Sequence, residues 1–103
     1  MTDLNFTFTS EIWVYQGKAA WFFVTLPMEE SRQIKFFNSH NKRRGWGAVR
    51  VKARIGKTEW QTSIFPDSKA GAYILPVKSE IRKKEKITAG NNIVVELNIL
   101  GYI

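Results

Sequence analysis

The amino-acid sequence predicts an all-β fold, a small barrel of about six or seven strands with two short helices packed at its ends. Apolar and polar residues alternate with a period of two along several stretches, and Gly-containing dipeptides separate pairs of these stretches. Residues 75–97 read as a strand, a proline, a short basic helix, a turn and a strand. With 103 residues, the chain is expected to form a single domain, residues 1–103.

The first predicted hairpin joins residues 6–15 to residues 19–26 through a two-residue Gln-Gly turn. A turn of this length sets Trp13 opposite Ala20. The face predicted to point inward then holds Phe6, Phe8, Ile12, Val14, Ala19, Trp21 and Phe23. The other face is apolar as well, so we expect this hairpin to be covered on both sides.

A helix is predicted to begin at Pro27, because proline is favoured in the first turn of a helix. It is expected to end within residues 38–41, whose side chains prefer turns. Ile34 and Phe37 lie three positions apart on one face of this helix, which we expect to pack against the barrel.

The second predicted hairpin joins residues 47–55 to residues 58–65 through Gly56-Lys57, a pair that suits a type II′ turn. This turn sets Arg54 opposite Glu59 and Ala53 opposite Trp60. One face of the hairpin is apolar and the other is charged, so the charged face is expected to contact water. The basic residues on that face are Arg50, Lys52 and Arg54.

The remaining elements are a loop over residues 66–71, a short strand over 72–75, a helix over 79–86 and a last strand over 93–99. Together the assignments predict one hydrophobic core. Its expected members are Phe8, Ile12, Val14, Trp21, Phe23, Ile34, Phe37, Val49, Val51, Trp60, Ile64, Ile81, Ile87, Val95 and Leu97.

The formal net charge of +7 raises the prospect of a polyanionic partner. No acidic residue lies between Glu30 and Glu59, an interval that contains nine basic residues. Guanidinium groups match phosphate, and an exposed tryptophan can stack on a base. The candidate surface for an anionic ligand or nucleic acid is Arg43, Arg44, Trp46, Arg50, Lys52 and Arg54. The alternative is a solvated face whose charges keep the barrel soluble and protect its edges.

The predicted helix over residues 79–86 is also basic, with Arg82, Lys83, Lys84 and Lys86. It is either a solvated helix held in place by Ile81 and Ile87 or a helix that contacts phosphate groups.

Several kinds of chemistry find no support in the sequence. The chain has no cysteine, which excludes disulfides, thiolate nucleophiles and cysteine-bound zinc. His40 is the only histidine and has no acidic neighbour, so we expect neither a catalytic nor a metal role for it. No nucleophile-elbow or glycine-rich phosphate motif occurs. We therefore expect no enzyme activity, no cofactor and no metal.

The N-terminal residues lack a basic segment followed by an apolar one, as a signal peptide would have. The longest apolar run, residues 19–24, is too short to cross a bilayer. A cytoplasmic protein with no membrane partner is expected.

Several short motifs, taken together, resemble a bacterial family catalogued as domain of unknown function nineteen-oh-five. They are Arg44-Gly45-Trp46-Gly47, Val49, Val51, Ile55-Gly56, Trp60, Thr62-Ser63, Leu75-Pro76-Val77-Lys78, Ile81-Arg82 and Gly90. The resemblance implies a double-split β-barrel, an architecture shared with antitoxin and transition-state-regulator DNA-binding domains. Some members are fused to a domain named for bacteriocin protection and porin association. No activity follows from this resemblance.

A more distant resemblance to the transition-state-regulator barrels lies in Pro76, Ile81, Arg82, Ile87, Gly90 and Asn91, which follow the order of those proteins. The spacing from proline to helix is longer here, and Glu85 replaces an expected leucine. The resemblance implies related fold geometry and does not carry over DNA binding, which generally depends on a barrel made of two chains. This chain contains enough predicted strands to form the barrel alone.

Two functions remain open from the sequence. The first is a non-catalytic module whose basic surface binds an anionic ligand or nucleic acid. The second is a protein-interaction or accessory domain of the bacteriocin-protection-associated type, in which the charge serves solubility.

Overall fold

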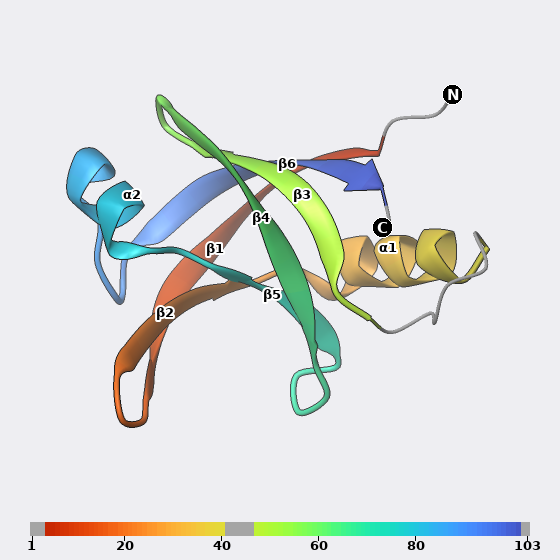
Figure 1. Cartoon of the computed structure of the whole chain (residues 1–103), viewed down its shortest axis with the longest axis horizontal. Helices are drawn as coiled ribbons and strands as arrows, with labels where there is room; N and C mark the ends of the chain where they lie inside the picture. The colour runs from red at the N-terminus through yellow and green to blue at the C-terminus, as the bar shows by residue number, and fades with distance from the viewer. Residues whose placement is uncertain (1–3, 41–46, 102–103) are drawn as a thin grey trace.

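The computed structural model, which describes residues 4–40 and 47–101, is a closed antiparallel barrel with two short helices (Figure 1). The strand order around the barrel is β1-β2-β5-β4-β3-β6. The elements are β1 (Asn5–Gln16), β2 (Ala20–Thr25), α1 (Met28–His40), β3 (Val49–Ile55), β4 (Thr58–Asp67), β5 (Ala72–Pro76), α2 (Ser79–Glu85) and β6 (Asn92–Gly101). The predicted fold class is confirmed, and each predicted element is present with bounds shifted by a few residues.

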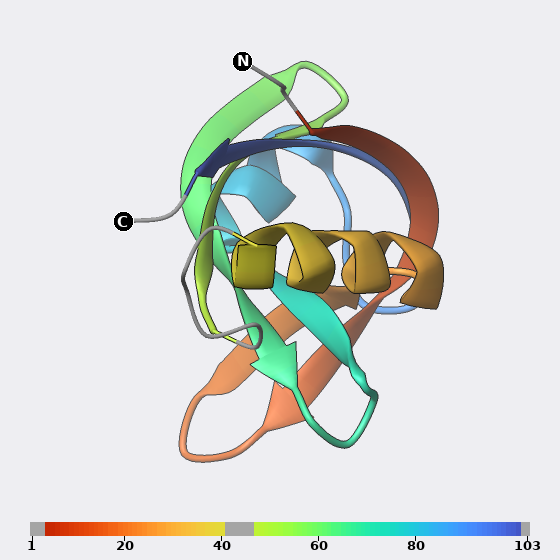
Figure 2. The ribbon, with the colours of Figure 1, turned by 90° about the vertical axis from the view of Figure 1, so that its right-hand side faces the viewer.

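The two helices cover opposite ends of the barrel. Figure 1 shows α2 at one end and α1 at the other, and Figure 2 shows α1 lying across the barrel opening. Ile34 anchors α1 and Ile81 anchors α2, and both side chains are buried. Ser31 adds a polar link, because its buried hydroxyl accepts a hydrogen bond from the Tyr73 backbone N–H at 3.0 Å.

The core contains most of the residues that the sequence predicts. Those buried as expected are Phe8, Ile12, Ile34, Val49, Val51, Ile64, Ile81, Val95 and Leu97. Phe37, Trp60 and Ile87 are partly buried against this core, and Val14 is half-buried. The prediction omitted Val24, Leu26, Ala53, Ile55, Tyr73, Leu75, Val77, Ile93 and Ile99, which are also buried there.

The predicted register of the first hairpin is wrong. Trp13 pairs with Phe23 rather than with Ala20, because the loop contains three residues, 17–19, instead of two. A change of register by an odd number of residues moves every side chain of a strand to the other face. Phe22 and Val24 therefore point toward the core, while Trp21 and Phe23 lie on the outer face.

The outer face of this hairpin is open to solvent, which corrects the expectation that both faces are covered. Tyr15 and Trp21 are 58% and 57% exposed. The predicted core thus included two aromatic side chains, Trp21 and Phe23, that belong to the molecular surface.

The second hairpin has the predicted register, with Ala53 opposite Trp60. Gly56 has φ +60°, and Lys57 is not among the described non-glycine residues with positive φ, as a type II′ turn requires. The carboxylate of Glu85 in α2 accepts hydrogen bonds from Thr58 Oγ1 at 2.5 Å and from the Lys57 backbone N–H at 3.3 Å. This contact fastens α2 to the turn between β3 and β4.

Neighbouring valines on β6 test the assignment of its inner face. Val95 is fully buried and Val94 is 53% exposed. Val95→Asp loses the burial of an aliphatic side chain, worth about 1.5–3 kcal/mol, and places a carboxylate in an apolar core. We expect it to abolish cooperative thermal unfolding in circular dichroism, while Val94→Asp retains it. A Val95→Asp variant as stable as the parent would contradict the assignment.

The Gly56 turn offers a second matched pair. Gly56 and Gly90 both have positive φ, but a Cβ at Gly56 would collide with the Glu85 carboxylate, whereas one at Gly90 meets no atom within 4 Å. Alanine at either site incurs backbone strain of about 1–2 kcal/mol. We expect Gly56→Ala to lower the free energy of unfolding in urea more than Gly90→Ala. Adding Glu85→Ala should remove most of that difference, and equal losses in both single variants would exclude the Glu85 contact as the cause.

Candidate functional site

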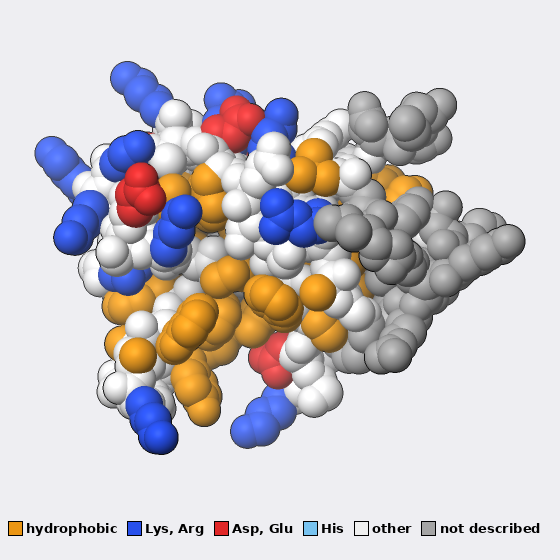
Figure 3. Space-filling view, viewed as in Figure 1, with side chains coloured by type: hydrophobic (Ala, Val, Ile, Leu, Met, Phe, Trp, Pro, Cys, Tyr) orange, Lys and Arg blue, Asp and Glu red, His pale blue; other side chains and the backbone are white. Residues whose placement is uncertain are grey.

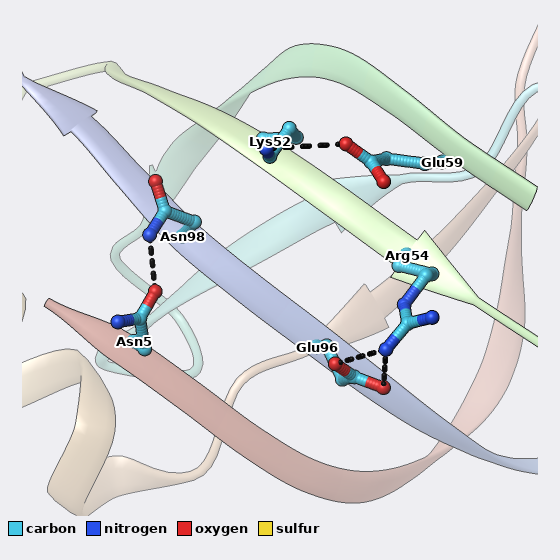
Figure 4. Close-up of polar contacts among 6 residues, drawn as sticks. All are labelled: Asn5, Lys52, Arg54, Glu59, Glu96 and Asn98. Atoms are coloured by element: carbon cyan, nitrogen blue, oxygen red, sulfur yellow. Dashed lines mark hydrogen bonds and ion pairs between the residues drawn. The ribbon is translucent and has the colours of Figure 1, made fainter.

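Three of the six predicted surface residues, Arg50, Lys52 and Arg54, alternate along the outer face of β3 with the buried residues of its inner face. Each side chain has a polar partner. Lys52 Nζ lies 3.2 Å from Glu59 Oε2, and an Arg54 terminal nitrogen donates to both Glu96 oxygens at 2.7 and 2.8 Å (Figure 4). An Arg50 terminal nitrogen lies 3.5 Å from Ser63 Oγ. We call these three basic residues the β3 row.

Carboxylates offset much of the positive charge of the β3 row. The hydrogen bond from Arg54 to Glu96, followed by the negative charge of that carboxylate, raises the pKa of Arg54 above its usual value. The Lys52–Glu59 and Arg54–Glu96 pairs line a groove over β1, β3, β4 and β6, beside a hydrogen bond from Asn98 Nδ2 to Asn5 Oδ1. A phosphate group approaching this groove would meet carboxylates as well as cations.

The other three predicted residues, Arg43, Arg44 and Trp46, lie outside the described residues. Whether they adjoin the β3 row stays a prediction. Within residues 4–40 and 47–101, no cluster of three or more His, Asp and Glu residues could hold a metal ion.

A second basic surface surrounds α2. Five cations and two carboxylates lie between residues 78 and 86. We call the five cations, Lys78, Arg82, Lys83, Lys84 and Lys86, the α2 surface. Glu85 is engaged with the β3–β4 turn, and Glu80 lies 3.8 Å from Lys78. The α2 surface therefore keeps an excess of positive charge, and Figure 3 shows basic side chains gathered at this end of the molecule.

An exposed aromatic groove lies next to the α2 surface. Its outer part follows the outer face of β1, β2, β5 and β4, and its inner part enters the barrel wall where β5 ends. The outer part is lined by Tyr15, Trp21, Phe23, Phe65, Ile74 and Pro76. The inner part includes Trp21, Phe22, Trp60, Pro76, Val77, Lys78 and Arg82. Both parts share Trp21 and Pro76, and Figure 3 shows hydrophobic side chains gathered in a hollow there.

The shortness of β5 produces the inner part of the groove. β5 pairs with β2 only as far as Pro76 opposite Phe23, and with β4 only from Phe65 onward. Beyond these pairs, residues of β2, of β4 and of the segment after Pro76 together line the inner part of the groove. The Val77 backbone N–H continues the contact with β2 by donating to the Phe22 carbonyl at 2.9 Å.

Ring packing holds the exposed Trp21 side chain in place. Its ring is nearly parallel to that of Phe23, with 11° between the planes and 6.3 Å between the centroids. Phe23 packs against Trp13 at 5.1 Å, and Trp13 Nε1 donates to Thr25 Oγ1 at 2.8 Å. The row of rings is thus flanked, on the same face, by a hydrogen-bonded tryptophan.

Arg82 positions a positive charge at the inner part of the groove. Its guanidinium carbon lies 3.7 Å from the centroid of the Phe22 ring, and its Nε donates to the Val77 carbonyl at 3.1 Å. Its terminal nitrogens form no hydrogen bond with the rest of the described chain. They are therefore available to an anionic ligand.

The sequence contains the residues of the groove but gave no indication of the site. Trp21 and Phe23 were predicted to be buried, because the first hairpin was given the wrong loop length. The α2 surface, in contrast, was apparent from the basic residues of its predicted helix.

No helix in the described part of the chain is long and apolar enough to cross a membrane. A search of curated proteins found no match to this chain. Residues 8–97 match the family described as a domain of unknown function, DUF1905, as the motifs around Gly56 and Pro76 indicate. Since the match covers most of its length, the chain belongs to the DUF1905 family.

Proposed function

We propose that this domain is a non-catalytic module that binds nucleic acid, with the α2 surface as its main contact to the phosphate backbone. The observation that carries the proposal is the excess of cations around α2, where Lys83, Lys84 and Lys86 are exposed. The two nearby carboxylates, Glu80 and Glu85, already have other partners. Lysine side chains on such a surface neutralise phosphates and release the counterions that these phosphates had bound.

The β3 row contributes less in this proposal, because Glu59 and Glu96 already pair with Lys52 and Arg54. Arg43, Arg44 and Trp46 remain candidates for a further contact. The proposal assigns binding and no reaction, no cofactor and no metal, in line with the sequence motifs. It also places the protein in the cytoplasm, where nucleic acid is available.

The alternative is a protein-interaction or accessory domain. The outer part of the aromatic groove favours it, since six apolar or aromatic side chains line that part without a charged residue. An exposed apolar patch on a small domain is typical of a surface that contacts another protein.

Salt dependence tests the proposal. If about four phosphates are contacted, the affinity for a single-stranded fluorescein-labelled oligonucleotide should fall roughly 50-fold between 50 and 200 mM salt, as measured by fluorescence anisotropy. Absence of binding to DNA and RNA oligonucleotides at 50 mM salt would contradict the proposal and favour the alternative.

Two variants that each remove two positive charges locate the contact. Lys83→Gln/Lys84→Gln alters the α2 surface, and Arg50→Gln/Lys52→Gln alters the β3 row. We expect the α2 variant to bind more weakly and to reduce the slope of log K against log salt by about 1.4, with a smaller change in the β3 variant. A larger loss of affinity in the β3 variant than in the α2 variant would assign the main phosphate contact to the β3 row.

A further inference from the structure

We infer that the aromatic groove takes the unpaired bases of a single-stranded nucleic acid, so that the domain prefers single strands to duplexes. This inference rests on the proposed function, and it assigns to the groove the part of the ligand that the α2 surface does not contact.

The groove has the surface that unstacked bases require. Tyr15 and Trp21 are directly opposite each other on β1 and β2, and both are more than half exposed. Phe65, on the far side of β5, is 44% exposed. A base can stack on any of these rings whatever its identity, because every base presents a π face. In a duplex those faces are covered by neighbouring bases.

The charge at the groove fits a nucleic-acid strand. Lys78 and Arg82 lie at its inner part, and no carboxylate is among the described residues that line either part. The remaining cations of the α2 surface continue from Arg82 along the helix. A strand whose phosphates follow α2 therefore has its bases beside Trp21 and Trp60.

The packing beside Trp21 makes the surface suitable for stacking. The Trp21 ring packs alongside Phe23 on the same face, Phe23 packs against Trp13, and Thr25 Oγ1 accepts a hydrogen bond from the Trp13 indole. A side chain that is already held in position loses little conformational freedom when a base stacks on it. The Arg82 guanidinium is held over Phe22 in a similar way, with its terminal nitrogens directed to no acceptor in the described chain.

The test compares three fluorescein-labelled ligands on the intact domain by anisotropy at 50 mM salt. They are an oligothymidylate of about twelve nucleotides, an abasic strand with the same number of phosphates, and a duplex of the same length. We expect the oligothymidylate to bind at least about tenfold more tightly than the abasic strand, because only its bases can stack. It should also bind more tightly than the duplex. A separate measurement with an oligouridylate of the same length shows whether RNA or DNA is the preferred single strand.

Variants connect this preference to the groove. Trp21→Ala should bind the oligothymidylate roughly tenfold more weakly and leave abasic binding unchanged, while Trp21→Phe, which keeps a ring, should retain most of the affinity. Phe36→Ala, which removes another exposed aromatic side chain on α1, is the matched control and should bind like the parent. Circular dichroism spectra of all variants should match that of the parent, which checks that each variant is folded.

The outcomes separate the two proposals. Equal affinity for the oligothymidylate, the abasic strand and the duplex would overturn the inference and leave the proposed function intact. Unchanged binding by Trp21→Ala would overturn it as well. Failure of all three ligands to bind would refute the proposed function itself and leave the groove to a protein partner.

Discussion

The closure of the barrel depends on side-chain alternation along its strands, with one shift of register between β3 and β6 at Arg50/Val51. Ile12, Val51 and Val95 are fully buried because each lies on the inner side of its strand, and each is followed by a residue on the outer side. A change of one residue in any loop would reverse this order in the strand that follows. The loop lengths therefore determine the composition of both the core and the outer surface.

The two hairpins show where the sequence is sufficient to predict the register and where it is not. Gly56-Lys57 defines a two-residue turn, and only one register buries Val51 while exposing Lys52, so turn and pattern agree. In the first hairpin both faces are apolar, and hydrophobicity cannot distinguish a two-residue loop from a three-residue loop. The exposed aromatic face was predicted as core for this reason.

The surroundings of the charged residues could also be predicted only in part from the sequence. The sequence predicted that Arg50, Lys52 and Arg54 point outward, and they do. Glu59 lies opposite Arg54, as predicted, but its carboxylate pairs with Lys52. Arg54 pairs instead with Glu96, 42 positions along the chain. β6 lies beside β3 only because the barrel closes, so a local pattern could not show that this row is partly neutralised. The cations of α2 have fewer such neighbours, and there the local pattern was a better guide.

The short β5 strand links the fold to the proposed site. Ending the strand at Pro76 leaves β2 and β4 without a paired strand between them at one end of the barrel, apart from the hydrogen bond of Val77 to Phe22. The segment before α2, with Arg82 of α2, lines that opening. Arg82 enters with α2 and covers Phe22 with its guanidinium. The same break in the sheet thus places a cation beside exposed aromatic rings. If β5 paired with β2 and β4 along their whole length, the strand would separate the Arg82 guanidinium from the aromatic rings. The α2 cations alone would attract any polyanion without regard to its bases.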